Sequence, residues 1–514
     1  MRRVHVAMAK NGLGLVILFL LGPSLPVAAD PVVVGYYTSW SIYGRDYQVE
    51  DLDAARLTHV NYAFSNIDAT TGTCVLGDPW ADVDRALDGD CWDPGCLRGN
   101  FRRFQLLKEA HPHLKLMISI GGWTWSSAFS QVAATEESRR RFAESCIDLY
   151  VRGEFGGSHG THPGIFDGID VDWEFPVSGG PSPGRPEDTA NFTLLMTELR
   201  EQLDALSLET GADYELSIAA GPAPSHRANL DIAGLAAVLD HVDVMAYDYH
   251  GGWEATSNFN APLQRSTDDP VLDPAGFSVA ESIDAYLAAG VPPEKLVMGL
   301  PLYGRCWSGV PAAGDGLHQP ASGTCPGTWE PGNVDYWDVV ANHLPTATRH
   351  FHERARVPWL HAGDLFISYD DAESFREKAA LACERGLAGV MLWELSGDLR
   401  DRDQSLLAVL EDALCPDAVA LRRIDDLRLA RDGDDLHFTW TLDPAAAGGH
   451  RVYSTDRVEE ARGLRGPAHS PIVTLPVGAE LPLVHVGGAM RDGVRLRLFQ
   501  VLSVAADGVT EGPG

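Results

Sequence analysis

Residues 166–176 read FDGIDVDWEFP, and this stretch decides how the rest of the chain is interpreted. In a β-strand, residues two apart lie on the same face, so Asp170, Asp172 and Glu174 share one face and the apolar side chains between them share the other. Carboxylates that face a protein interior are costly unless they share protons or hydrogen bonds. A surface strand with a wet acidic face fits poorly, because the opposite face is apolar and a Gly/Pro-rich loop follows. Since Pro176 marks the strand exit, Glu174 is expected at the carboxyl end of an inward-facing strand.

Seven further short apolar segments resemble parallel strands that are buried on both faces. Together with 168–174, the predicted strands are 32–37, 57–64, 114–120, 214–220, 241–247, 296–302 and 387–393. Helical patterns lie between them, for example at 136–150, 190–206 and 278–289. Eight strands, most followed by a helix, predict an α/β fold of the (β/α)₈ TIM barrel type. The stretch before the last strand is too long for one helix and contains a strand-like run at 365–369, which predicts an inserted subdomain at about 303–386.

The two ends of the chain have a different character from the predicted barrel at 30–417. The chain has 514 residues, enough for one large barrel and smaller additional parts. A basic start, an apolar run too short to span a membrane and small residues at 27–29 predict a secretory signal peptide over 1–29. After Pro416, alternating patterns at 434–442, 450–454 and 494–505, separated by turn residues, predict a small β-sandwich over 418–514.

Charge and cysteine content restrict the partners and the compartment. Lys and Arg number 40 and Asp and Glu number 72, which gives a formal net charge of −32. So acidic a chain is poorly suited to nucleic acid or anionic lipid, and we expect neither as a partner. Eight cysteines in a chain with an export signal predict disulfides, with Cys306 and Cys325 as a candidate local pair. No C-x-x-C motif occurs, which argues against a zinc ribbon.

A metal site is the alternative interpretation of the acidic strand. Carboxylates alone suit Mg²⁺ or Ca²⁺, but those ions favour ligands from mobile loops or from phosphate substrates. We therefore expect no metal and no cofactor at this strand. His159 and His162 lie in a Gly-rich loop, and a solvated loop is favoured there over a metal site.

Four motifs, in order along the chain, resemble those of glycoside hydrolase family 18. Residues 167–174 match the D-x-x-D-x-D-x-E signature, and 119–122, SIGG, match S-x-G-G. Residues 245–248, MAYD, match M-x-Y-D, and 392–394, LWE, match the tryptophan of the final strand. The resemblance covers about 32–414 and is strongest to bacterial chitinase A type enzymes of subgroup A. It implies a TIM barrel with an α+β insertion between strands 7 and 8 and the hydrolysis of chitin. The C-terminal region resembles a fibronectin type III module.

The resemblance also implies roles for four residues. Glu174 corresponds to the general acid that protonates the glycosidic oxygen and then acts as base on water, which requires a raised pKa. Asp172 corresponds to the residue that binds the substrate acetamido N–H, and Asp170 behind it can share a proton with it. Tyr247 corresponds to the phenol that holds the acetamido oxygen. Because the family uses this substrate oxygen as its nucleophile, no second enzyme carboxylate is needed.

Ten further side chains match substrate-binding or supporting positions of the family. Aromatic residues at strand ends can stack on sugar rings, and Trp393 corresponds to the floor under the distorted −1 sugar. Tyr36 and Ser119 correspond to residues that support the Asp170–Asp172 pair. The expected substrate-binding set is Trp393, Asp248, Met245, Tyr36, Ser119, Trp123, Trp40, Trp253, Phe64 and Arg305.

We therefore expect a secreted, extracellular, monomeric chitinase that cleaves chitin or chitooligosaccharides with retention. A chitin-binding lectin of the same fold would have lost the acid, whereas Glu174 is present. An endo-β-N-acetylglucosaminidase acting on glycoprotein glycans keeps the same signature, but the tryptophan-lined cleft and the long insertion favour chitin. The sequence leaves open endo against exo action, processivity and the role of the C-terminal region.

Overall fold

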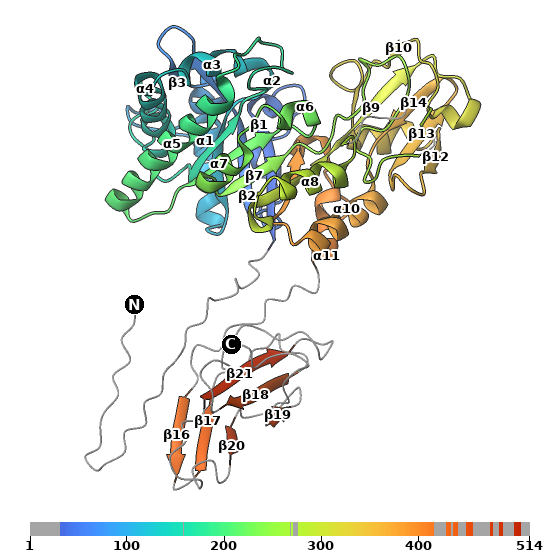
Figure 1. Ribbon diagram of the computed structural model, residues 1–514. Helices are drawn as coiled ribbons and strands as arrows, with labels where there is room; N and C mark the ends of the chain where they lie inside the picture. The colour runs from blue at the N-terminus through green and yellow to red at the C-terminus, as the bar shows by residue number, and fades with distance from the viewer. Residues whose placement is uncertain are drawn as a thin grey trace. The chain divides into compact units, whose positions relative to one another are not determined.

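The computed structural model describes residues 31–157, 159–267, 269–270 and 276–415, together with six strands of the C-terminal region. The predicted signal peptide at 1–29 lies outside the described residues. The chain divides into two compact units, and one of them spans Pro31–Pro416. This unit holds both the barrel and the insertion (Figure 1).

Eight parallel strands close into a barrel, which confirms the predicted fold class. In chain order they are β1 (Val32–Thr38), β2 (His59–Asp68), β4 (Lys115–Gly121), β5 (Gly168–Asp172), β6 (Glu215–Ala220), β7 (His241–Val244), β8 (Leu296–Pro301) and β15 (Gly389–Trp393). Each pairs in parallel with its neighbour in this order, and β1 closes the ring by pairing with both β2 and β15. The short strand β3 (Thr73–Val75) adds to β2 in antiparallel orientation.

Helices form the outer ring of the barrel (Figure 1). The main ones are α1 (Gly99–Ala110), α4 (Glu136–Cys146), α5 (Asp188–Thr210), α7 (Ile232–Val238), α8 (Val279–Ala288), α10 (Ala372–Arg385) and α11 (Leu406–Ala413). Short helices α2 (Gly122–Trp125), α3 (Phe129–Val132) and α6 (Pro224–Arg227) follow barrel strands, and α9 (Tyr336–Asp338) lies in the insertion. Between β1 and β2 the chain forms only the short turns Ser39–Ile42 and Val49–Asp51.

Local sequence signals define the ends of these helices. Thr135 and Asp371 each accept a backbone N–H at the start of a helix in a reciprocal capping box, at α4 and α10. Ser278 caps α8 by accepting the Glu281 N–H with its hydroxyl. Gly211 and Gly386 end α5 and α10 in the left-handed conformation that glycine adopts without steric cost.

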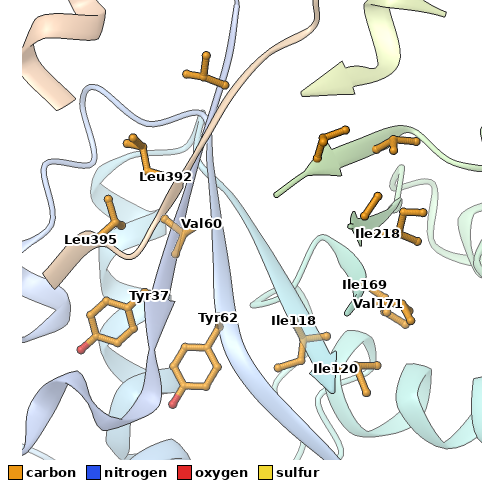
Figure 2. Packing of buried hydrophobic residues seen from close by; sticks show 14 of the residues in the cluster. Tyr37, Val60, Tyr62, Ile118, Ile120, Ile169, Val171, Ile218, Leu392 and Leu395 are labelled. Atoms are coloured by element: carbon orange, nitrogen blue, oxygen red, sulfur yellow. The ribbon is translucent and has the colours of Figure 1, made fainter. Parts of the chain in front are cut away.

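The main hydrophobic core lies between the barrel wall and the helices. Figure 2 shows side chains such as Val60, Tyr62, Ile118 and Val171 in this layer, and all of them are buried. Trp173 belongs to the same layer, because its ring stacks on Phe129 with 5.4 Å between centroids. The predicted alternation of 166–176 is therefore confirmed. The strand itself ends at Asp172, so Glu174 lies just beyond it.

The predicted insertion contains a second, antiparallel sheet that forms a lobe beside the barrel (Figure 1). Its strands are β9 (Tyr303–Ser308), β10 (Gly323–Thr324), β11 (Asn333–Asp335), β12 (Thr348–Phe351), β13 (Pro358–Ala362) and β14 (Leu365–Ser368). The order is β10-β9-β14-β13-β12, and β11 also pairs with β9. A separate cluster of buried side chains, including Trp307, Trp359 and Phe366, packs the lobe. Helix α10 then leads the chain back to β15.

The described strands of the C-terminal region form two three-stranded antiparallel sheets. Strands β16 (Arg428–Asp432), β17 (Asp435–Thr439) and β20 (Leu483–Val486) make one, and β18 (Gly449–Thr455), β19 (Val473–Leu475) and β21 (Leu498–Val504) make the other. They overlap the three predicted strand segments. The resemblance to a fibronectin type III module stays a prediction.

Four disulfides join all eight cysteines: Cys74–Cys146, Cys91–Cys96, Cys306–Cys325 and Cys383–Cys415. The predicted local pair, Cys306–Cys325, is among them and ties β9 to the loop that follows β10. Among the helices of the described part of the chain, none combines the length and the hydrophobicity needed to cross a bilayer.

Candidate active site

The carboxylates of the acidic strand point into the barrel toward its carboxyl end. Asp170 is fully buried inside the barrel, and Asp172, one pleat further on, is 3% exposed. Glu174 follows at the mouth, where its side chain keeps some surface toward solvent. The three predicted residues therefore lie in one column that runs from the barrel interior to its mouth.

Asp170 is held by four hydrogen-bond donors from four other strands. The hydroxyls of Tyr36 and Ser119 donate to its Oδ2 at 2.6 Å and 2.8 Å, as expected from the sequence. The Asn61 amide donates to the same oxygen at 3.0 Å, and the Ser217 hydroxyl donates to Oδ1 at 2.7 Å. Because all four of these neighbours donate, Asp170 is the acceptor toward each of them, and its position is fixed from all sides.

Asp172 lies between Asp170 and Glu174; it interacts with the Asp170 carboxyl and has a long contact to the Tyr36 hydroxyl, at 3.5 Å. Burial and the negative charge of Asp170 raise the pKa of the Asp172 carboxyl well above its usual range. Two carboxyls this close in a barrel interior cannot both ionise cheaply, which favours the protonated form of Asp172.

Glu174 is placed as a proton donor near neutral pH. Burial, followed by the negative charge of Asp248, raises the pKa of Glu174 to about 8. Although part of its surface faces the cleft, the surrounding protein is dense enough for lost hydration to be the main cause. Its backbone N–H donates to the Ser126 hydroxyl at 2.9 Å, which anchors the residue to the turn after β4. A carboxylic acid that keeps its proton at pH 7 is suited to general acid catalysis.

A phenol, Tyr247, and a carboxylate, Asp248, come from the loop after β7, and Asp248 pairs with Arg305 on β9. Tyr247 is buried, and its hydroxyl contacts Sδ of Met391 at 3.7 Å. Asp248 accepts hydrogen bonds of 2.7 Å from both Nε and Nη2 of Arg305 and from the Tyr303 hydroxyl. Burial opposes the charge on Arg305, but the surrounding groups, Asp248 first among them, together raise the pKa of the guanidinium. The predicted strand at 241–247 ends earlier, at Val244, so Tyr247 and Asp248 lie on a loop.

An aromatic cluster forms the floor next to the carboxyl column. Trp393, at the end of β15, packs edge to face against Tyr36 at 5.2 Å and is stacked with Phe64 at 5.9 Å. Phe64 in turn contacts Trp40 at 6.1 Å. Met245 packs partly buried against the same cluster. The rings of this cluster offer flat apolar surface beside a proton donor.

Two further predicted tryptophans lie at the rim with most of their surface free. Trp123 is 55% exposed and Trp253 is 61% exposed, and the Arg305 guanidinium lies over the Trp253 ring at 5.3 Å. On the Trp40 side, a cleft of about 480 Å³ opens between the barrel and the insertion. It is lined by Trp40, Tyr43, Gly44, Arg45, Leu302, Tyr303, Trp329, Glu330, Asn333, Asp335, Trp393, Glu394 and Gly397.

Four polar residues of the site were not anticipated: Asn61, Ser217, Ser126 and Asp243. Asn61 and Ser217 lie at inward-facing positions of apolar strands. A polar residue at such a position indicates a contact inside the barrel, so the strand register could have identified both. Asp243 also points inward from β7, and burial and the charge of Asp170 raise its pKa. Within the described part of the chain, its Oδ1 has no hydrogen-bond partner. Ser126 acts through its contact with a backbone, which no side-chain pattern reveals.

A group with metal-ligand chemistry lies at the opposite end of the barrel. One nitrogen each from His59 and His241 and an oxygen of Glu215 lie within 4.8 Å of one another. One oxygen of Glu215 is already bonded there to His59 Nε2 at 2.8 Å, and the other accepts a hydrogen bond from Lys115 Nζ. Because both carboxylate oxygens have partners and one is an ammonium group, an ion-pair network explains the cluster without a metal.

A proton donor beside an aromatic floor is typical of enzymes that cleave glycosidic bonds. Sugar rings stack on aromatic side chains, and the departing sugar is a poor leaving group that needs a proton. The model for Glycosyl hydrolases family 18 matches residues 32–398. This chain therefore belongs to glycosyl hydrolase family 18 and is a glycoside hydrolase.

Relatives and solved structures agree with this assignment. Chitinase A1 of Niallia circulans is 41% identical over 440 residues, which cover 76% of this chain and 61% of that protein. The catalytic domain of psychrophilic chitinase B from Arthrobacter TAD20 matches with a TM-score of 0.70 at 34% identity, over 76% of this chain and 97% of that domain. The Ostrinia furnacalis Group IV chitinase in complex with allosamidin matches with a TM-score of 0.66 at 31% identity, over 75% of this chain and 99% of that one.

Proposed function

We propose that this protein is a secreted chitinase that hydrolyses β-1,4-linked N-acetylglucosamine chains by a retaining, substrate-assisted mechanism. The observation that carries the proposal is the arrangement of Glu174, whose pKa of about 8 keeps it protonated, directly above the Asp172–Asp170 pair. Asp248, a further carboxylate of the site, is engaged by Arg305 and Tyr303 and is therefore unsuited to act as a nucleophile.

In the first step, Glu174 donates its proton to the glycosidic oxygen as the bond to C1 breaks. The acetamido oxygen of the −1 sugar attacks C1 and forms an oxazolinium ring, so the leaving chain departs as a neutral alcohol. Asp172 accepts the acetamido N–H and offsets the positive charge, while the proton it shares with Asp170 can shift between them. Tyr247 donates its hydroxyl to the acetamido oxygen and orients it.

In the second step, Glu174 is a carboxylate and takes a proton from water. That water attacks C1 from the face that the leaving chain vacated, and the oxazolinium ring opens to restore the acetamido group. Two inversions at C1 give net retention, and Glu174 regains its proton. Tethering the nucleophile to the substrate replaces a bimolecular encounter, which can supply a large part of the rate enhancement.

The substrate class is inferred from the cleft and from the relatives. Trp393, Trp40, Trp123 and Trp253 provide several flat aromatic surfaces, which suit a long chain of sugar rings rather than a single ring. Chitinase A1 and the insect chitinase crystallised with allosamidin support chitin as the polymer. The insertion is proposed to be that of subgroup A, because it supplies Trp329 and Arg305 to the walls.

Export and modular organisation complete the proposal. Residues 1–29 would be removed as a signal peptide, and the four disulfides of the barrel unit agree with folding in an oxidising compartment. Residues 418–514 would form a fibronectin type III-like module, and the catalytic unit at 30–417 would act as a monomer.

The test is a digest of chitohexaose followed by NMR of the freshly formed products. The expected first product is the β-anomer. An α-anomer would contradict retention. A parallel digest of a glycoprotein bearing N-glycans separates a chitinase from an endo-β-N-acetylglucosaminidase, since only the latter releases the glycans.

A further inference from the structure

A histidine outside the motifs of the active site packs against the residue that follows Glu174. His226 lies on the short helix α6 after β6, and its imidazole is stacked on the Phe175 ring with 3.9 Å between centroids and 18° between planes. Phe175 is 9% exposed and is bonded directly to Glu174. The imidazole therefore touches the neighbour of the proposed acid over a whole ring face.

Glycines make room for this ring on two sides. A Cβ added at Gly221 would lie 2.4 Å from Nδ1 of His226, and one added at Gly179 would lie 2.8 Å from its Cδ2. Both distances are shorter than any real contact, so the ring fills the space between the end of β6 and the loop after Glu174. In that loop, a Cβ at Gly180 would lie 2.1 Å from the Glu174 carbonyl oxygen. The loop is therefore packed against both the ring and the backbone of Glu174.

The imidazole of His226 contributes a flat packing surface, and its buried nitrogen, Nδ1, makes no hydrogen bond among the described residues. Burial, followed by the charge of Arg227, lowers the pKa of His226 to about 4. The ring is thus neutral at neutral pH, and packing against Phe175 is its main interaction.

Glu174 is fixed from its other side by Ser126. The Glu174 N–H donates to the Ser126 hydroxyl, which lies 2.8 Å from the Gly122 carbonyl oxygen and 3.0 Å from that of Asp172. The amino side of Glu174 is therefore anchored to β5 and to the turn after β4. On the carboxyl side, where the chain turns into a glycine-rich loop, the His226 ring stacked on Phe175 is the corresponding support.

We propose that His226 is a positioning residue for Glu174: its neutral ring, stacked on Phe175, fixes the backbone that carries the acid. The inference rests on the proposed function, because it requires Glu174 to be the proton donor. Misplacement of a catalytic group by 1 Å can cost about 10²-fold in rate. The effect should fall on kcat, since the sugar-stacking tryptophans do not depend on this contact.

The first experiment compares H226A and H226F with wild type on chitotetraose. H226A is expected to lower kcat by about 10²-fold with KM changed less than about threefold. H226F, which keeps a flat neutral ring, is expected to retain kcat within about threefold. S225A, an exposed neighbour on the same helix, is the matched control and should behave as wild type.

A pH profile separates positioning from a general loss of stability. When the loop loosens, water reaches Glu174 and its raised pKa falls, so the basic limb of kcat/KM should move to lower pH in H226A and stay in place in H226F. A folded H226A that keeps wild-type kcat and the wild-type basic limb would overturn the inference. So would an H226F as impaired as H226A, because imidazole chemistry rather than packing would then matter.

G221A tests the same contact while keeping the His226 ring. Its added methyl group displaces His226, so G221A should lower kcat. The loss of kcat that G221A adds should be smaller in the H226A background than in the H226F background, because the smaller side chain leaves room for the methyl group. If G221A lowered kcat by the same factor whatever residue stands at 226, its effect would not depend on His226, which would contradict the inference. Failure of the proposed function looks different: E174Q would then stay active, whatever the variants of His226 do.

Discussion

The hydroxyl of Tyr36, on β1, donates a hydrogen bond of 2.6 Å to Oδ2 of Asp170, on β5, across the interior of the barrel. Burial, together with the charges of Asp170 and Asp172, raises the pKa of Tyr36 well above its usual range, so the phenol remains a donor at every working pH. It also reaches Asp172 at 3.5 Å and packs against Trp393. One side chain thus connects the carboxyl pair with the aromatic floor.

Removing this hydroxyl should impair turnover without unfolding the barrel. Y36F leaves Asp170 with three of its four donors, and removing one hydrogen-bond partner of a buried polar group costs about 1–3 kcal/mol. We expect kcat on chitotetraose to fall by about 10- to 100-fold. The matched control is Y37F, which removes a buried hydroxyl from the outer face of the same strand, where it donates to the Tyr47 carbonyl. Equal kcat values for Y36F and Y37F would show that the Asp170 contact is irrelevant to the reaction.

Glu174→Gln should abolish proton donation while preserving the shape of the site. Because general acid catalysis contributes about 10²- to 10⁴-fold and the leaving group is poor, we expect kcat to fall by at least about 10³-fold. Calorimetry should still detect chitohexaose binding, since the aromatic floor is untouched. E187Q, which changes an exposed carboxylate just before α5, is the control and should be fully active. A tenth of wild-type turnover in E174Q would exclude Glu174 as the acid.

The same variant should be more stable than wild type in alkaline solution. The pKa of Glu174 is about 8 in the folded chain and near its ordinary value in the unfolded chain. Between these values the folded state binds the extra proton, so the free energy of unfolding of wild type falls as pH rises from about 4.5 to about 8. The amide side chain of E174Q does not titrate, so the stability difference between E174Q and wild type should grow over this window. Urea denaturation at about pH 5 and about pH 8 measures it, and a constant difference would contradict the raised pKa.

Asp248 provides a way to change the pKa of Glu174 without touching it. Its charge is the second cause of the raised pKa, after burial. D248N should therefore move the basic limb of kcat/KM to lower pH, by less than one unit because burial remains. KM should rise as well, since Arg305 loses its carboxylate partner. An unchanged basic limb of kcat/KM in an otherwise active D248N would mean that the charge of Asp248 does not affect the pKa of Glu174.

The alternation of charge and apolar residues at 166–176 predicted both the barrel strand and the column of carboxyls, because a period of two is set by the strand itself. Asn61 and Ser217 were harder to predict. A single polar residue in an apolar strand does not reveal its partner, and only the closed barrel shows that both contact Asp170. His226 could not be found at all from the sequence. Its contact with Phe175 depends on how two loops meet, and no periodic pattern encodes that meeting.

The nucleophile itself can be tested by changing the substrate instead of the protein. Besides Glu174, the described carboxyls of the site include Asp172, which is held protonated or shares its proton with Asp170, and Asp248, which is bound by Arg305. If the acetamido oxygen attacks C1, a −1 sugar that carries a free amine cannot form the oxazolinium ring. Partly deacetylated chitosan should therefore be cleaved only after acetylated sugars, so that every new reducing end carries an acetamido group. Sequencing of the products by mass spectrometry measures this directly, with fully acetylated chitohexaose as the control for activity. New reducing ends that carry a free amine as often as the starting polymer does would mean that an enzyme group attacks C1 and that the substrate-assisted mechanism is wrong.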